Sequence, residues 1–188
     1  MTALLDVAPV ARRPDIAETL EGVDVVRPTH VEVLACGALD RGDDGAAVMA
    51  VGRLADALPL DVRTRIVGQL DIDDLLTVPK GAGVVVADTA LGVDPGWIVE
   101  IPFSGLAGRE AGIRPRSSHA LSIPETIAVA SIIRGHPLPG IVVAIGGVDF
   151  GLGEALSWPV ASAMDAFVLA IADAIGRVRT LALAPSEN

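Results

Sequence analysis

The sequence is poor in aromatic residues. Phe and Trp make up 3% of the 188 residues, and Tyr is absent. The core must therefore be built from aliphatic side chains, and a hydrophobic fraction of 51% supplies enough of them for one well-buried domain. Aliphatic runs of this kind are typical of parallel strands that are covered by helices on both faces.

Cysteine, long apolar runs and positive charge are also scarce. The one cysteine, Cys36, excludes an intrachain disulfide and a cysteine-based zinc site. No apolar run approaches the roughly 20 residues that span a bilayer, and no apolar stretch follows the arginine pair Arg12 and Arg13. We therefore expect a cytoplasmic protein with no membrane partner. The net charge of −10 argues against nucleic acid as a partner.

Hydrophobic patterning predicts alternating strands and helices. Strands are expected at residues 31–36, 62–67, 84–87, 97–102 and 141–145, and helices at residues 43–57, 71–76, 124–133 and 159–179. This order predicts a three-layer α/β/α sandwich with a mostly parallel five-stranded sheet. We expect residues 30–184 to form a single domain, flanked by a peripheral arm at residues 1–29 and a disordered tail at residues 185–188.

Three side chains that can bind metal come from three different connections. Asp44 follows the first strand beside Asp43, Asp88 ends the third strand, and His119 closes the long loop at residues 103–118. Sites in such sheets lie beyond the carboxyl ends of the strands, so we expect the three residues on one rim. Two carboxylates and an imidazole can supply three ligands to a divalent transition metal, with positions left open for water or substrate.

Simpler roles and one rival site remain open for the same residues. Asp43 or Asp44 can cap the first helix, and Asp88 can serve as a turn residue. Cys36 could instead form a Cys-His-Asp relay with His119 and Asp88. Its position inside an apolar run favours a buried core thiol over a nucleophile.

Three short motifs resemble those of a known family. Residues 37–47 read G-A-L-D-R-G-D-D-G-A-A, residues 87–90 read A-D-T-A, and residues 117–119 read S-S-H. In order and context they resemble the [NiFe]-hydrogenase maturation endopeptidases, and the resemblance covers about residues 31–178. These enzymes trim a C-terminal extension from the hydrogenase large-subunit precursor after nickel insertion.

The resemblance assigns roles to the candidate residues. The family's metal-contacting positions fall on Asp44, Asp88 and His119. The resemblance implies a peptidase whose partner is the large-subunit precursor and whose nickel arrives inside that substrate. The sequence departs from the family at Ala38, where Asn is usual, at Asp44, where Glu is usual, and at Gln69, within the usual D-G-G-T stretch. A chaperone that binds the nickel-loaded precursor without cutting it is therefore an alternative.

Overall fold

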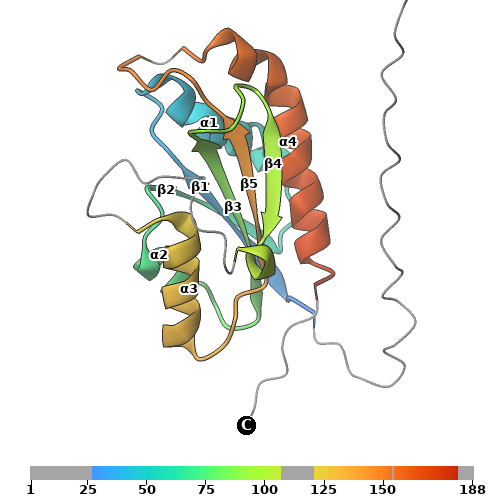
Figure 1. Ribbon diagram of the computed structural model, residues 1–188. Helices are drawn as coiled ribbons and strands as arrows, with labels where there is room; N and C mark the ends of the chain where they lie inside the picture. The colour runs from blue at the N-terminus through green and yellow to red at the C-terminus, as the bar shows by residue number, and fades with distance from the viewer. Residues whose placement is uncertain (1–26, 107–120, 154, 182–188) are drawn as a thin grey trace, which may run out of the picture.

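The computed structural model describes residues 27–106, 121–153 and 155–181, which form a three-layer α/β/α sandwich (Figure 1). Within these residues one sheet contains β1 (His30–Cys36), β2 (Val62–Gly68), β3 (Ala82–Ala90), β4 (Ile98–Pro102) and β5 (Gly140–Gly146). The spatial order is β2-β1-β3-β5-β4, with β4 antiparallel to β5 and the other neighbours parallel. The predicted fold class is confirmed.

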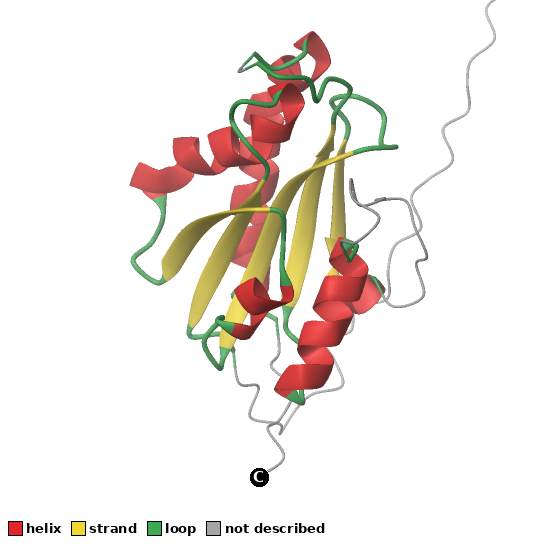
Figure 2. Cartoon of the chain, turned by 90° about the vertical axis from the view of Figure 1, so that its left-hand side faces the viewer, coloured by secondary structure: helices red, strands yellow, loops and turns green. Residues whose placement is uncertain are grey.

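Helices cover both faces of the sheet (Figure 2). One face carries α1 (Ala46–Leu54) and α4 (Trp158–Val178), and the other carries α2 (Ile72–Leu76) and α3 (Ile123–Arg134). Successive strand residues point to opposite faces, so Val31 and Val33 of β1 pack under α1 and α4, while Leu34 and Cys36 face α2 and α3. Burial on both faces explains why β1 is a continuous apolar run, whereas the edge strand β2 carries polar residues and buries only Val62.

Helices α2 and α3 both begin with a side-chain N-cap. The carboxylate of Asp71 caps α2, and the carboxylate of Asp74 accepts a hydrogen bond from the Asp71 backbone N–H at 3.0 Å. Ser122 and Glu125 form the same reciprocal capping box at the start of α3, where the Ser122 N–H donates to Glu125 at 2.7 Å. Each cap satisfies amide groups that the first helical turn leaves unpaired, which stabilises a helix by about 1 kcal/mol.

Helix α4 is long and apolar enough to span a membrane by length and composition alone, but its pattern is that of a core helix. Its buried residues recur every three or four positions, and they are Val160, Met164, Phe167, Ile171, Ala174, Ile175 and Val178. The outer face carries charged side chains among apolar ones: Asp165 pairs with Arg53 of α1 at 3.1 Å, and Arg177 pairs with Glu100 of β4. This amphipathic surface helix covers one face of the sheet.

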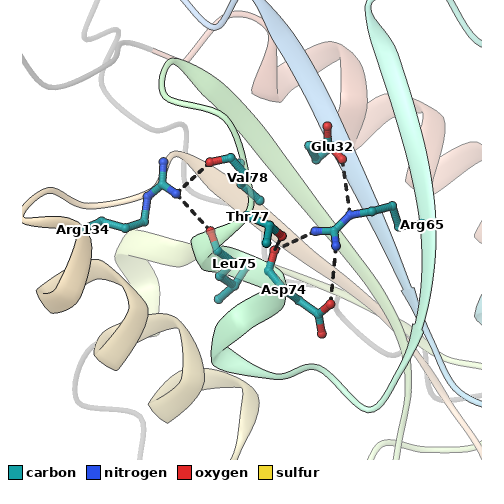
Figure 3. Close-up of polar contacts among 7 residues, drawn as sticks. All are labelled: Glu32, Arg65, Asp74, Leu75, Thr77, Val78 and Arg134. Carbon is teal, nitrogen blue, oxygen red and sulfur yellow. Dashed lines mark hydrogen bonds and ion pairs between the residues drawn. The ribbon is translucent and has the colours of Figure 1, made fainter.

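Two arginines fix α2 against its neighbours (Figure 3). Arg65 of β2 lies 3.6 Å from the buried Glu32 of β1 and donates to the Asp74 carbonyl of α2 at 2.6 Å. Arg134 of α3 donates to three carbonyls at the end of α2, those of Leu75, Leu76 and Val78. These contacts hold α2, and with it the preceding residues 68–70, against the sheet and α3.

Two predicted boundaries near the site are wrong. Strand β3 continues two residues beyond Asp88, because Asp88 pairs with Ala144 of β5 and the ladder runs on to the end of both strands. The first helix does not begin at Asp43: residues Gly42–Gly45 form a 3₁₀ turn, and Gly45 is the N-cap of α1 without a side-chain cap. The predicted aspartate cap is absent because the carboxylate of Asp43 binds another loop.

Candidate active site

A cleft of about 530 Å³ lies at the carboxyl end of the parallel strands. Asp44 and Asp88, two of the three predicted metal contacts, both line it, and so does Cys36. The third predicted contact, His119, lies outside the described residues. Parallel strands end at the same edge of a sheet, which is why side chains 44 positions apart in the sequence meet in one cleft.

The loop before Asp44 is folded tightly onto it. Gly37 has a φ of +108°, and a Cβ at this position would lie 1.8 Å from the Asp44 carbonyl oxygen, so only glycine fits. The next residue, Ala38, donates its backbone N–H to the Asp44 carboxylate at 3.2 Å. This contact is made by the main chain, so it does not depend on the Asn side chain that Ala38 replaces.

Asp88 is held in place by its own strand. Its side chain lies on the sheet face that packs against α2 and α3, and one carboxylate oxygen accepts the Thr89 N–H at 2.8 Å. The Thr89 hydroxyl donates to the Asp43 carbonyl oxygen at 2.8 Å on the other side of the strand. The strand that carries Asp88 is therefore joined directly to the 3₁₀ turn that carries Asp44.

Asp43 is the residue whose role the sequence analysis missed. Its side chain is fully buried and binds the loop that follows β5. One oxygen accepts the N–H groups of Val148 and Asp149 at 2.8 and 2.9 Å, together with the Ser157 hydroxyl at 2.8 Å. The other oxygen accepts the Ser157 N–H at 2.7 Å. Asp43 thus fixes Val148, Asp149 and Ser157, next to Phe150 on the cleft wall, while its neighbour Asp44 faces the cleft.

These hydrogen bonds keep Asp43 ionised. Burial by itself would raise the pKa of this carboxyl group, but the N–H groups of Asp149, Val148 and Ser157 and the Ser157 hydroxyl together lower it. Every one of these partners donates a hydrogen. The pocket around the side chain is therefore complementary to a carboxylate and not to a carboxylic acid.

Cys36 is a poor nucleophile in this position. Only 2% of its surface is exposed, and burial raises the pKa of its thiol well above the usual range. The nearby carboxylates of Asp88, Asp74 and Asp44 raise the pKa further, against a smaller opposing effect of a hydrogen bond with the Leu70 backbone. The reactive form of cysteine is the thiolate, so this environment favours the core-thiol interpretation.

If the chain has the processing activity that the resemblance implies, replacing Cys36 by alanine should leave its rate within about twofold of wild type and lower stability by about 1 kcal/mol, as for other small core truncations. The measurement is the initial rate of precursor shortening, followed by mass spectrometry, with urea unfolding alongside. Loss of processing in a variant that still folds would instead support the hypothesis of a Cys-His-Asp relay.

Solved structures share this fold. The hydrogenase maturating endopeptidase HybD from E. coli superposes with a TM-score of 0.65, covering 85% of this chain and 99% of its own, at 16% identity. The [NiFe] hydrogenase maturation protease HybD from Thermococcus kodakarensis superposes with a TM-score of 0.63, covering 78% of this chain and 99% of its own, at 19% identity. The chain has the hydrogenase maturation protease fold.

A hydrogenase 2 maturation peptidase from Thaumarchaeota archaeon SCGC_AB-539-E09 is 26% identical, with a TM-score of 0.52 over 78% of this chain and 98% of its own. No family model and no curated protein matches the sequence. The likeness therefore lies in the backbone more than in the sequence.

In this maturation protease fold, the positions that depart from the family motifs surround the cleft. Ala38, Asp44 and Gln69 all line it, next to Gly68. Arg41 is the only cationic side chain among the described lining residues, which include the carboxylates of Asp44 and Asp88. Within residues 27–106, 121–153 and 155–181, no three His, Cys, Asp or Glu side chains are grouped to hold a metal.

Proposed function

We propose that this chain is an endopeptidase that removes the C-terminal extension of a [NiFe]-hydrogenase large-subunit precursor after nickel insertion. One observation carries the proposal. Asp44 and Asp88, the positions that match the metal-contacting residues of the family motifs, line a single cleft at the carboxyl end of the sheet. The fold shared with solved structures named as hydrogenase maturation proteases supports the same activity.

Nickel enters this reaction as part of the substrate. The carboxylates of Asp44 and Asp88 and the imidazole of His119 are oxygen and nitrogen donors, which nickel accepts. A precursor that already carries nickel would bring the remaining ligands itself. Binding of the substrate's metal would then make cleavage conditional on completed metal insertion.

The two carboxylates are fixed before substrate arrives. Asp44 is oriented by the Ala38 N–H and Asp88 by the Thr89 N–H, so neither has to be ordered when the metal-bearing segment enters. A divalent metal polarises a carbonyl group and lowers the pKa of bound water, which supplies the chemistry of peptide hydrolysis without a protein nucleophile. The protein contributes the fixed position of the scissile bond.

The test compares two forms of the same precursor. Purified chain is incubated with nickel-loaded and with metal-free large-subunit precursor, and the precursor mass is followed over time. We expect shortening of the nickel-loaded form alone. Shortening of both forms would contradict a role for nickel, and capture of the nickel-loaded precursor without shortening would identify a non-catalytic chaperone instead.

A further inference from the structure

Both tryptophans of the chain are exposed. Trp97 is 68% and Trp158 80% exposed, although tryptophan is one of the more deeply buried residue types on average. Val148 and Leu152, in the loop after β5, are 59% and 88% exposed. Large exposed apolar groups that gather in one place mark interaction surfaces on soluble proteins.

Backbone contacts bring Trp97, Val148 and Trp158 close together. The Asp43 carboxylate binds the N–H groups of Val148 and Ser157, so Trp158 follows a residue held beside Val148. A Cβ at Gly96 would lie 2.7 Å from the Pro159 carbonyl oxygen, which places Trp97 next to the first turn of α4. We call Trp97, Val148 and Trp158 the tryptophan patch.

The tryptophan patch shares the loop after β5 with the cleft wall. Phe150, on the cleft wall, lies between Val148 and Leu152 in the same loop. The Gly146 N–H donates to the Trp97 carbonyl oxygen at 2.8 Å, so the first residues of β4 adjoin the start of that loop. A folded protein whose C-terminal segment occupies the cleft must rest on the surface beside it.

The charges around the patch define the partner's chemistry. Asp94 and Asp149 are exposed beside it: a Cβ at Gly146 would lie 2.1 Å from the Asp94 carbonyl oxygen, and Asp149 follows Val148. With a net charge of −10, these carboxylates repel a second copy of the chain and an anionic membrane surface. They attract an apolar protein surface that has basic residues at its rim.

We infer that the tryptophan patch is the docking surface for the folded body of the large-subunit precursor, through an apolar face edged by Lys or Arg. The inference rests on the proposed function and adds a second contact, outside the cleft, to the contact with the metal-bearing segment. Exposed tryptophans that become buried at the centre of an interface carry a large share of binding energy. The patch would therefore set affinity, while Asp44 and Asp88 serve the reaction.

The two tryptophans allow docking to be observed directly. The full chain is labelled with 5-fluorotryptophan, and its two ¹⁹F resonances, assigned with Trp97→Phe and Trp158→Phe, are followed as nickel-loaded precursor is added. Both resonances should shift. Unchanged resonances under conditions where the precursor binds would overturn the inference, as would equal shifts caused by anionic vesicles or by raising the concentration of the chain alone.

Kinetics separate docking from catalysis. The double variant Trp97→Ala/Trp158→Ala should raise KM for the folded precursor at least tenfold and leave kcat within twofold. The control, Ile132→Ala/Ile133→Ala, removes two exposed side chains at the far end of α3 and should change neither constant. An unchanged KM in the tryptophan variant overturns the inference. Shifted ¹⁹F resonances with an uncut precursor would instead overturn the proposed activity, and the docking surface would remain supported.

Discussion

Replacing Asp43 by alanine is expected to lower the free energy of unfolding by about 3 kcal/mol, because three backbone N–H groups and one hydroxyl lose their acceptor. Each buried donor left unpaired costs about 1–3 kcal/mol, and partial access of water to the loop reduces the sum. A domain of ordinary stability has about 5–15 kcal/mol in total, so the variant should unfold at a much lower urea concentration.

Two further variants show whether the cause is the charge. Asp43→Asn keeps the size of the side chain, but its amide group would point a donor at other donors, so it should be destabilised nearly as much as alanine. Asp165→Ala removes an exposed carboxylate that pairs with Arg53 on the surface and should cost less than 1 kcal/mol. Equal effects of Asp43→Ala and Asp165→Ala would refute the loop-anchoring role.

The contribution of Asp43 should also depend on pH. The pKa of its carboxyl group is lowered in the folded protein, so the folded state favours the ionised form. The stabilisation is therefore complete above the unfolded pKa of about 3.9 and disappears as the pH falls through the lower folded pKa. The difference in unfolding free energy between wild type and Asp43→Asn should be constant near pH 7 and shrink below about pH 4. A difference that does not change with pH would exclude ionisation as the cause.

The fold was predictable because its signals are local. The aliphatic run of β1 and the polar residues of β2 follow from their positions inside and at the edge of the sheet. Asp71 and Ser122 begin their helices through hydrogen bonds to residues at most three positions away. The strand ends were less predictable. Strand β3 passes Asp88 because β5 pairs with it, and this partner lies more than 50 residues further along the chain.

The site could be predicted in part for the same reason. The rule that parallel strands end at one edge correctly brought Asp44 and Asp88 into one cleft. The role of Asp43 could not be inferred, because its partners Val148, Asp149 and Ser157 are more than 100 residues away in a loop whose path no local pattern specifies. Only two sequence signals pointed to this role. They were an acidic residue beside a candidate ligand, and a distant glycine-rich loop after a buried strand.

Replacing Asp44 or Asp88 by alanine is expected to reduce processing of the nickel-loaded precursor by at least about 10²-fold. Loss of a group that merely orients a metal ligand already costs about 10–100-fold, and these residues are proposed to contact the metal directly. Both side chains border the open cleft, so the variants should fold like the wild type. The measurements are single-turnover cleavage rates and urea unfolding of the same preparations.

Asp44→Glu is the matched variant, because it keeps the carboxylate and adds one methylene, the length usual in the family motif. A cleft of about 530 Å³ has room for that group, so the variant should retain at least a tenth of wild-type activity while Asp44→Ala does not. The comparison separates the effect of the carboxylate's charge from the effect of its position. Equal losses of activity in Asp44→Glu and Asp44→Ala would mean that the position of the carboxylate, fixed by the Ala38 N–H, decides the reaction. Wild-type rates in both Asp44→Ala and Asp88→Ala would exclude the two carboxylates from metal contact, and the source of the catalytic power would have to lie elsewhere on the rim.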